Sequence, residues 1–225
     1  MKPHGILLGK NFGDGEVVNN GTISVSDGGL AALVAPTVRN NGTINARFGR
    51  VALASGEKVT VDLYGDNLIE LALDSNASKA VIEQSGTINA EGGTVQITAR
   101  AAKDVVDSVI NMDGIINASS VTQDGGRIVL SGDNVNVNGT MNVNGKNAGK
   151  VTVEATKKIN VGKKASITAS ATTNTGKAGT VLVQAQESAV VAGTIEAKGA
   201  EDTGFVDTSA ADLSFTDTAS VNTTG

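Results

Sequence analysis

The sequence predicts an all-β protein, a right-handed parallel β-helix (a solenoid) that carries one protruding β-hairpin. Three observations predict this fold: short phrases recur along the 225 residues, each phrase alternates apolar and polar residues, and no segment keeps a helical period. The composition agrees, because aromatic residues make up only 2% of the chain and glycine occurs 28 times. The core must then be built from Val, Ile, Leu and Ala, which suit a narrow, layered interior.

The first recurring phrase is an apolar residue, three spacers, Gly, and then Thr-Ile or a close variant. Its alternation places Ile44 and Ala46 on one face of a strand and Thr43 and Asn45 on the other. The clear copies have their glycines at Gly21, Gly42, Gly86, Gly114, Gly139 and Gly193. Because these glycines are separated by 21, 44, 28, 25 and 54 residues, we expect coils of 21–28 residues, with the two largest gaps each spanning two coils.

The second phrase follows the first and consists of Gly, one spacer, and two apolar residues separated by one position. In one copy Val95 and Ile97 share a face opposite Gln96, which indicates a second strand with one buried side. The copies begin at Gly29, Gly49, Gly93, Gly126, Gly149 and Gly179. Gly and Asn between the phrases are expected to turn the chain through positive φ.

Stacked coils align equivalent residues into ladders, because a single coil cannot bury its own apolar face. We expect one interior ladder of Ile23, Ile44, Ile88, Ile116, Met141, Ile167 and Ile195, beside a second of Ala46, Ala90, Ala118, Ala169 and Ala197. The repeats predict a β-helix domain over residues 1–200 with about eight coils. Residues 201–225 are expected to form a terminal coil or a frayed continuation of the stack.

One segment, residues 56–78, interrupts the repeat. Two alternating runs, residues 58–63 and 68–73, flank the stretch Tyr64-Gly65-Asp66-Asn67. Because Gly-Asp-Asn is favourable turn chemistry, we expect a β-hairpin that leaves the stack and packs against its flank.

These phrases, taken in order, resemble the haemagglutination-activity region of filamentous haemagglutinins and high-molecular-weight adhesins, the exoproteins of two-partner secretion. Residues 38–46 are similar to the V-x-N-x-G-x-I-x-A coil of that family, and residues 49–62 resemble the coil that precedes its extra-helical hairpin. Residues 203–209, Thr-Gly-Phe-Val-Asp-Thr-Ser, resemble a G-G-F-V-E-T-S stretch of the adhesins. The resemblance covers nearly the whole chain.

The resemblance implies a structural segment of a large secreted adhesin that mediates attachment at the bacterial cell surface. Its implied partners are an outer-membrane two-partner secretion transporter and a host-cell or glycan receptor of unknown identity. The family's secretion domain carries Asn-Pro motifs, whereas this chain has no Asn-Pro and no signal-peptide pattern at its N-terminus. We therefore expect an N-terminally truncated fragment of a secreted parent. The stem of a contact-dependent growth-inhibition toxin is one alternative.

Charge and composition exclude several other classes of function. The net charge is −5 with no basic stripe, which argues against a nucleic-acid partner. No apolar run approaches the roughly 18–20 residues that span a bilayer, so no membrane insertion is expected. There is no cysteine and only one histidine, His4, so the sequence predicts no metal site and no cofactor.

The serious enzymatic alternative is a polysaccharide lyase or glycosidase, because other β-helices carry such activities. These enzymes need clustered carboxylates with Arg or Lys on one exposed ladder. The candidates are Asp124, Arg127, Asp133 and Glu154, which do not share one coil phase and have no Trp beside them. We expect them to form solvated surface and assign no catalytic residue.

Acidic corners recur at one phase as Asp27-Gly28-Gly29, Glu91-Gly92-Gly93 and Asp124-Gly125-Gly126. Carboxylates in such corners are potential calcium ligands, but the nonapeptide calcium repeat is absent. We expect these corners to be turns.

Asn-x-Ser/Thr sequons occur at Asn20, Asn41, Asn76, Asn117, Asn138 and Asn222. The resemblance implies that sugars are one possible modification there, since some of the adhesins are glycosylated at such sequons. The residues themselves favour a simpler interpretation, in which Asn-Gly-Thr forms the corners of the coils.

Overall fold

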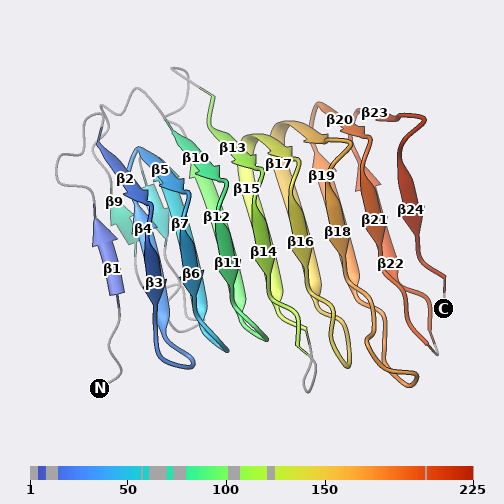
Figure 1. The fold of residues 1–225 in the computed structure, drawn as a ribbon. Helices are drawn as coiled ribbons and strands as arrows, with labels where there is room; N and C mark the ends of the chain where they lie inside the picture. The colour runs from blue at the N-terminus through green and yellow to red at the C-terminus, as the bar shows by residue number, and fades with distance from the viewer. Residues whose placement is uncertain are drawn as a thin grey trace.

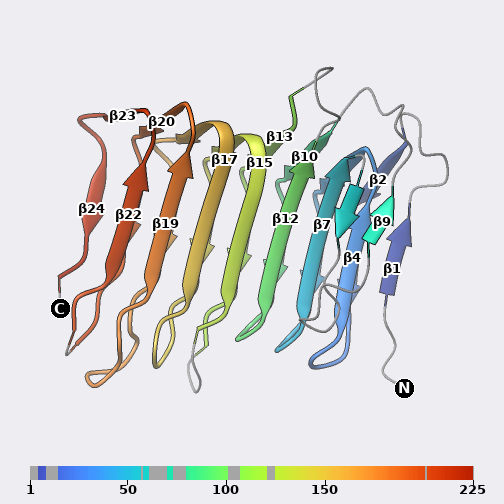
Figure 2. The same cartoon turned by 180° about the vertical axis from the view of Figure 1, so that it is seen from behind.

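The computed structural model describes residues 5–8, 15–56, 58–60, 70–72, 80–100, 107–120, 125–200 and 202–224. These residues form 24 β-strands, and none of them belongs to a helix that could cross a membrane. From the N-terminus to the C-terminus the chain runs down the front of the molecule, up the back and over the top (Figures 1 and 2). This path is a right-handed turn, so the predicted right-handed parallel β-helix is confirmed.

Each coil contributes strands to three faces, which we name from Figure 1. The back face contains β1 (Gly5–Leu8), β4 (Leu30–Val34), β7 (Arg50–Gly56), β12 (Thr94–Arg100), the first half of β15 (Arg127–Val137), the first half of β17 (Lys150–Val161), β19 (Thr180–Ala185) and β22 (Phe205–Ser209). The top face contains β2 (Glu16–Asn19), β5 (Thr37–Asn40), β10 (Val81–Gln84), β13 (Val109–Met112), the second halves of β15 and β17, β20 (Ser188–Val191) and β23 (Asp212–Phe215). Since β15 and β17 bend across the edge, the back and top faces form one 14-stranded sheet.

The front face is a separate eight-stranded parallel sheet. Its strands are β3 (Thr22–Ser24), β6 (Thr43–Asn45), β11 (Thr87–Asn89), β14 (Ile115–Asn117), β16 (Thr140–Asn142), β18 (Ser166–Thr168), β21 (Thr194–Glu196) and β24 (Ser220–Asn222). The predicted isoleucine ladder is confirmed residue by residue from Ile23 to Ile195, and Val221 extends it. The predicted alanine positions are also fully buried beside it, with Val143 taking the place of an alanine in the fifth coil.

The expectation that the 44-residue gap between Gly42 and Gly86 spans two coils is wrong. Ile44 pairs directly with Ile88, so this stretch is one coil and not two. The extra length is the segment that leaves the stack after β7. The spacing was ambiguous because a long insertion and a second coil add similar numbers of residues.

The predicted hairpin is present as β8 (Lys58–Thr60) and β9 (Glu70–Ala72), which pair antiparallel. The other residues of the predicted hairpin, 57, 61–69 and 73–78, lie outside the described residues. β8 lies next to β7 and β12. The back face beneath has outward-facing apolar side chains that are nevertheless buried, namely Leu30, Ala32, Val34, Ala52 and Ala54. The outer surface of β4 and β7 is therefore not exposed to solvent, and β8 lies beside it next to β7.

Most corner glycines are needed because the backbones of successive coils lie too close together there for a side chain. The expectation that these glycines have positive φ is wrong for most of them. Among the described residues, only Gly28, Gly56, Gly92 and Phe48 have positive φ. A Cβ on Gly114 would instead lie 2.1 Å from the carbonyl oxygen of Gly86, one coil earlier. A Cβ on Gly139 would likewise lie 2.0 Å from the carbonyl oxygen of Gly114. The glycine ladder therefore lets successive backbones approach where a side chain would not fit.

A polar ladder that the sequence did not reveal lies inside the first coils. Asn19, Asn40 and Gln84 occupy interior positions of β2, β5 and β10, and Asn40 and Gln84 are completely buried. Asn19 Nδ2 donates to Asn40 Oδ1 at 2.7 Å, and Asn40 Nδ2 donates to Gln84 Oε1 at 2.8 Å. At the end of the ladder, Gln84 Nε2 donates to the carbonyl oxygen of Gly86 at 2.9 Å. Because every amide has a partner, the ladder is compatible with a dry core.

Candidate functional site

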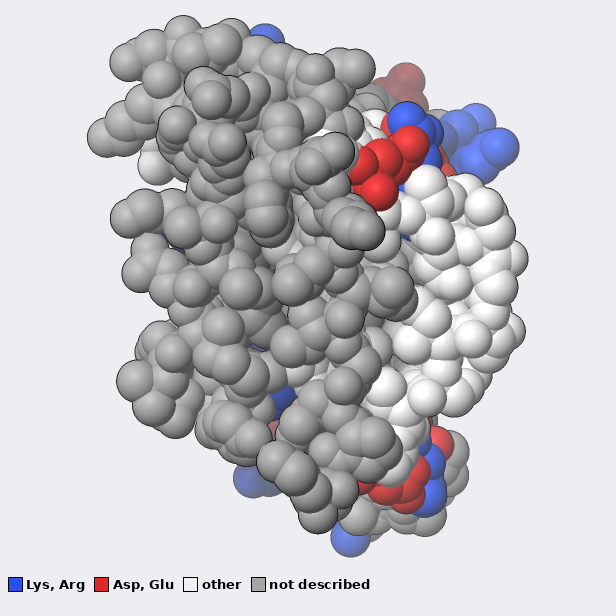
Figure 3. Space-filling view, turned by 90° about the vertical axis from the view of Figure 1, so that its left-hand side faces the viewer, with Lys and Arg blue, Asp and Glu red and all other residues white. Residues whose placement is uncertain are grey.

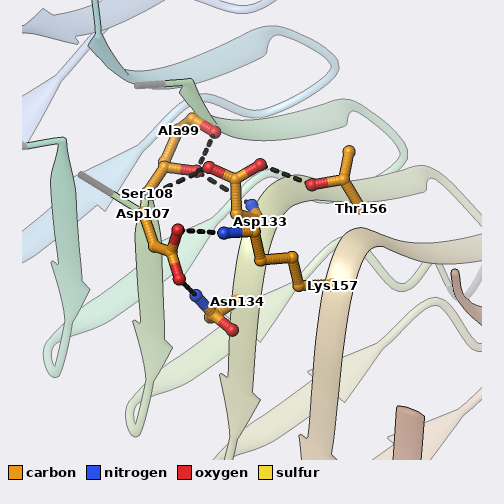
Figure 4. A network of polar contacts seen from close by, with 7 residues as sticks. All are labelled: Ala99, Asp107, Ser108, Asp133, Asn134, Thr156 and Lys157. Atoms are coloured by element: carbon orange, nitrogen blue, oxygen red, sulfur yellow. Dashed lines mark hydrogen bonds and ion pairs between the residues drawn. The ribbon is translucent and has the colours of Figure 1, made fainter. Parts of the chain in front are cut away.

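The most connected polar group among the sequence candidates is Asp133, at the bend of β15 between the back and top faces (Figure 4). Its Oδ2 accepts hydrogen bonds from the backbone N–H of Ser108 at 2.9 Å and from the Ser108 hydroxyl at 3.0 Å. Its Oδ1 accepts from the hydroxyl of Thr156 in the next coil. The register shift at this bend, between Gly132 and Asn134, places the carboxylate where these donors converge.

Ser108 ties the same bend to the preceding strand. Its hydroxyl is fully buried, lies 2.8 Å from the carbonyl oxygen of Ala99, and accepts from the backbone N–H of Asp133 at 2.8 Å. Beside it, Asp107 pairs with Lys157 and accepts from Asn134 Nδ2 at 3.2 Å. The group links three successive coils at the edge of the stack. We call it the clip, and it consists of Asp107, Ser108, Asp133, Asn134, Thr156 and Lys157.

The protonation states of the clip follow from these contacts. Partial burial raises the pKa of Asp133, but the hydrogen bonds from Thr156 and Ser108 outweigh it and leave the pKa below its ordinary value. The hydrogen bond from Lys157, followed by that from Asn134, lowers the pKa of Asp107. The same contact with Asp107 raises the pKa of Lys157. All three groups are therefore charged at neutral pH.

We expect the clip to lose its contribution to stability in acid. Because the folded pKa of Asp133 is depressed, its contribution is complete above the unfolded value of about 3.9 and is lost as the pH falls below it. Solvent screening limits the contribution to about 1 kcal/mol. Urea unfolding between pH 7 and pH 3 should show a smaller acid-induced loss for Asp133→Asn than for the parent. Equal losses in the two proteins would contradict this assignment.

The structure does not bring the described enzymatic candidates together. Arg127 pairs with Lys150 at the start of the back-face strands, whereas Glu154 lies opposite Ser131. The four-residue offset along the strand separates Arg127 from Glu154 by about 13 Å. The Asp133 carboxylate accepts hydrogen bonds from Ser108 and Thr156. Asp124 and the lone histidine, His4, lie outside the described residues.

A shallow groove of about 480 Å³ runs along the corner between the front and back faces. Its floor consists of glycine and alanine from four successive coils, and Arg127 and Lys150 stand at its back-face wall. The groove exists because the described residues of its floor are glycine and alanine, which carry no large side chain. No carboxylate occurs among the described residues that line the groove.

An arginine of this chain lies between two of the acidic corners. Arg47 lies one coil from each of Asp27 and Glu91, and its guanidinium contacts them at 3.1 Å and 3.6 Å. The guanidinium also stacks over the ring of Phe48, 4.4 Å from its centroid. Arg47 therefore supplies positive charge between these two carboxylates. Among the described residues, no group of three potential ligands is arranged to hold a metal ion.

The described sequon asparagines take part in hydrogen bonds within and between coils. Asn41 Nδ2 donates to Asn20 Oδ1 at 2.9 Å, and Asn138 Nδ2 donates to Asp113 Oδ1 at 3.0 Å. The Oδ1 atoms of Asn117 and Asn222 accept backbone N–H groups two residues later. These contacts give the asparagines a structural role in the coils. Asn76 lies outside the described residues.

The front face presents an uncharged polar surface. Its outward residues form a row of hydroxyls, which consists of Thr22, Thr43, Thr87, Thr140, Ser166, Thr194 and Ser220 and is interrupted by the exposed Ile115. A second row contains asparagines, and Asn89 Nδ2 donates to Asn45 Oδ1 at 3.0 Å. Glu196 is the only charged residue on these eight strands, and Lys198 pairs with it at 2.7 Å. In Figure 3 the stack is seen from its N-terminal end, with the front face at the right. Charged side chains lie above and below the visible part of this face, and none lies on it.

Sequence reasoning missed the clip and the uncharged face, although signals for both were present. Ser108 and Asp133 are 25 residues apart, which is one coil, so the expected period already placed them side by side. The Thr and Asn of each Gly-Thr-Ile-Asn phrase alternate with the buried Ile, so they had to form outward rows.

Comparison with known proteins gives partial matches to much longer chains. No protein-family profile matches the sequence. One heme/hemopexin-binding protein of Haemophilus influenzae is 33% identical over 97 residues, which is 43% of this chain and 10% of the relative. Another, from Haemophilus influenzae strain KW20 Rd, is 30% identical over 149 residues, which is 66% of this chain and 16% of the relative. The matched part thus spans at most about a sixth of these relatives.

Proposed function

We propose that this chain is a structural segment of a large secreted surface protein of the two-partner secretion type, similar to filamentous haemagglutinins, which mediates attachment. The observation that carries the proposal is the unbroken ladder of coils from Ile23 to Val221, which builds an elongated stem rather than a pocket. The partial similarity to two much longer proteins supports a larger parent. An outer-membrane transporter would export that parent to the cell surface.

We place the contact surface on the front face. An adhesin stem needs a broad surface that repeats along its length, and the front face offers hydroxyl and amide rows at the strand spacing of about 4.8 Å. Its lack of unpaired charge suits a neutral partner, such as an uncharged glycan, better than a polyanion. On the back face, by contrast, the outward side chains of β4 and β7 are buried.

Beads coated with the purified chain test the attachment role. We expect saturable binding to host epithelial cells that is lost when the front-face residues Thr87 and Thr140 are both replaced by lysine. A matched control carries lysine at Thr94 and Thr180 on the back face, where the side chains are similarly half-buried. No saturable binding by the parent, or equal loss in both variants, would contradict the assignment of the front face.

Binding of haem or of a haem-carrying protein is the second candidate, favoured by the names of the two relatives. Haem iron is held by His, Cys, Met or Tyr. The chain has no Cys, and Met112 and Met141, the only side chains of these types among the described residues, are fully buried. We therefore expect any such role to use contact with hemopexin rather than direct ligation. Titration with haemin and with hemopexin separates the two, and a haemin Soret shift at unit stoichiometry would contradict this expectation.

We also propose that the chain has no enzymatic activity. Asp133 accepts hydrogen bonds within the clip. Arg127 and Glu154 lie too far apart to act on one glycosidic bond. Incubation with a panel of neutral and acidic polysaccharides should yield no new reducing ends. Turnover that disappears in Glu154→Gln or Asp133→Asn would favour the glycan-active alternative instead.

A further inference from the structure

The groove between the front and back faces, along the lower edge of the stack in Figure 1, has a row of polar side chains on one wall. Arg127 and Lys150 line this wall on two successive coils and pair in register, so their backbones lie about 4.8 Å apart. Thr94 occupies the same position one coil before Arg127, and Thr180 occupies it one coil after Lys150. The wall therefore presents two adjacent cations with a hydroxyl at each end of the row.

The two cations of the wall are not neutralised within the part of the chain that the structure describes. Neither Arg127 nor Lys150 forms an ion pair there, whereas Arg39, Arg47 and Lys157 all do. Arg127 is exposed and Lys150 is half-buried. Both side chains can therefore bind an anion without giving up a described partner.

Two further lysines add positive charge to the same corner. The backbone N–H of Ala148, which lines the groove, donates to the carbonyl oxygen of Lys177 at 2.9 Å, so these two corner loops lie side by side. Lys146 precedes Ala148 in its loop, and both lysines are exposed. Positive charge thus gathers at this corner, although the net charge of the whole chain is −5.

The described carboxylates near the two ends of the groove have partners in the protein. Glu91, which precedes the lining residue Gly92, is contacted by the Arg47 guanidinium at 3.6 Å. Asp202 Oδ1 accepts the backbone N–H of Ala178 at 2.7 Å. The charge that the groove offers to a ligand is therefore positive, which favours an anionic partner.

The floor of the groove indicates which class of anion fits. The backbone N–H groups of Gly93, Gly126 and Gly149 donate to carbonyl oxygens of the chain itself, at 2.6, 2.7 and 2.8 Å. An extended peptide would find neither an open strand edge nor an apolar pocket, which are the usual means of peptide recognition. The described lining residues include no aromatic ring on which a nucleic-acid base could stack. A sugar chain needs none of these, because its hydroxyls can bond to water and to the threonines of the wall.

We propose that this groove binds a linear acidic polysaccharide, which runs along the stack with its carboxylates on Arg127 and Lys150. A guanidinium binds a carboxylate through two parallel hydrogen bonds, and the lysine adds a second charge one coil away. The volume of about 480 Å³, spread over four coils, suits a short stretch of such a chain. The groove is separate from the front face, so the proposal goes beyond the proposed attachment role and does not rest on it.

Fluorescence anisotropy with a labelled alginate oligosaccharide, a linear polyuronate, tests the proposal on the purified chain. We expect saturable binding that weakens as salt is added, because the contacts are exposed charges. The double variant Arg127→Gln/Lys150→Gln should raise the dissociation constant about tenfold or more. The matched control is Lys163→Gln/Lys164→Gln, since both lysines are exposed, lie outside the groove and remove the same charge. The control should change the dissociation constant about twofold or less.

A neutral dextran oligosaccharide and a poly-glutamate peptide test the class of ligand. The dextran should not bind, and the peptide should bind more weakly than the alginate oligosaccharide. Absence of saturable alginate binding, or equal loss of binding in the two double variants, would overturn the proposal. Equal binding of dextran, or tighter binding of the peptide, would overturn it as well.

Discussion

Replacing Gly114 by alanine is expected to lower the free energy of unfolding by about 3 kcal/mol. The added Cβ would lie 2.1 Å from the carbonyl oxygen of Gly86, and that oxygen accepts the hydrogen bond of Ile115 that joins the two coils. The clash is with backbone, which cannot rotate away as a side chain can. Relief therefore requires the two coils to separate, which weakens the hydrogen bonds on both sides of the corner.

Gly21 provides the matched control, because it has the same place in the first coil. A Cβ on Gly21 would meet no atom of the described residues within 4 Å. Gly21→Ala should therefore be neutral, or stabilising by about 0.5 kcal/mol through the smaller entropy of the unfolded chain. Urea unfolding followed by far-UV circular dichroism measures both variants. Similar costs for the two would show that the glycines act through local backbone conformation and not through close approach.

The contrast between Gly21 and Gly114 also shows what the sequence could and could not predict. Alternation and spacing predicted the strands and the ladders, because each depends on the side chains of one repeat. The reason for the glycines depends on how closely two coils approach, which is a distance that no single repeat contains. The 44-residue gap was misinterpreted for the same reason, since only the pairing of Ile44 with Ile88 separates an insertion from an additional coil.

The candidate site shows a similar division. The sequence named Asp133 as a surface carboxylate, but its partners Ser108 and Thr156 come from other coils. The acidic corners were expected to be turns, but the sequence did not reveal that the stack places Arg47 between Asp27 and Glu91. In both cases the chemistry of a residue was set by its neighbours one coil away. A residue-by-residue alignment at the coil period is the signal that would have found them.

Asn40 illustrates this most clearly, since the corner begins at the next residue, Asn41, and yet the Asn40 side chain is completely buried. Asn40→Ala is expected to cost about 3–5 kcal/mol. The change leaves Gln84 Oε1 without its donor and leaves Asn19 Nδ2 with only the carbonyl oxygen of Thr43 at 3.4 Å. Each unpaired buried group costs about 1–3 kcal/mol, and the cavity adds to that cost.

Replacing the whole ladder should cost less than breaking it at one point. The same interior phase holds Met112, Val137, Val161 and Val191 in later coils, so the fold accepts apolar side chains there. The triple variant Asn19→Val/Asn40→Val/Gln84→Met should therefore stay within about 1.5 kcal/mol of the parent. Urea unfolding of the single and triple variants decides the matter. A triple variant less stable than Asn40→Ala would mean that the amides supply net stabilisation, rather than only satisfying one another inside the core.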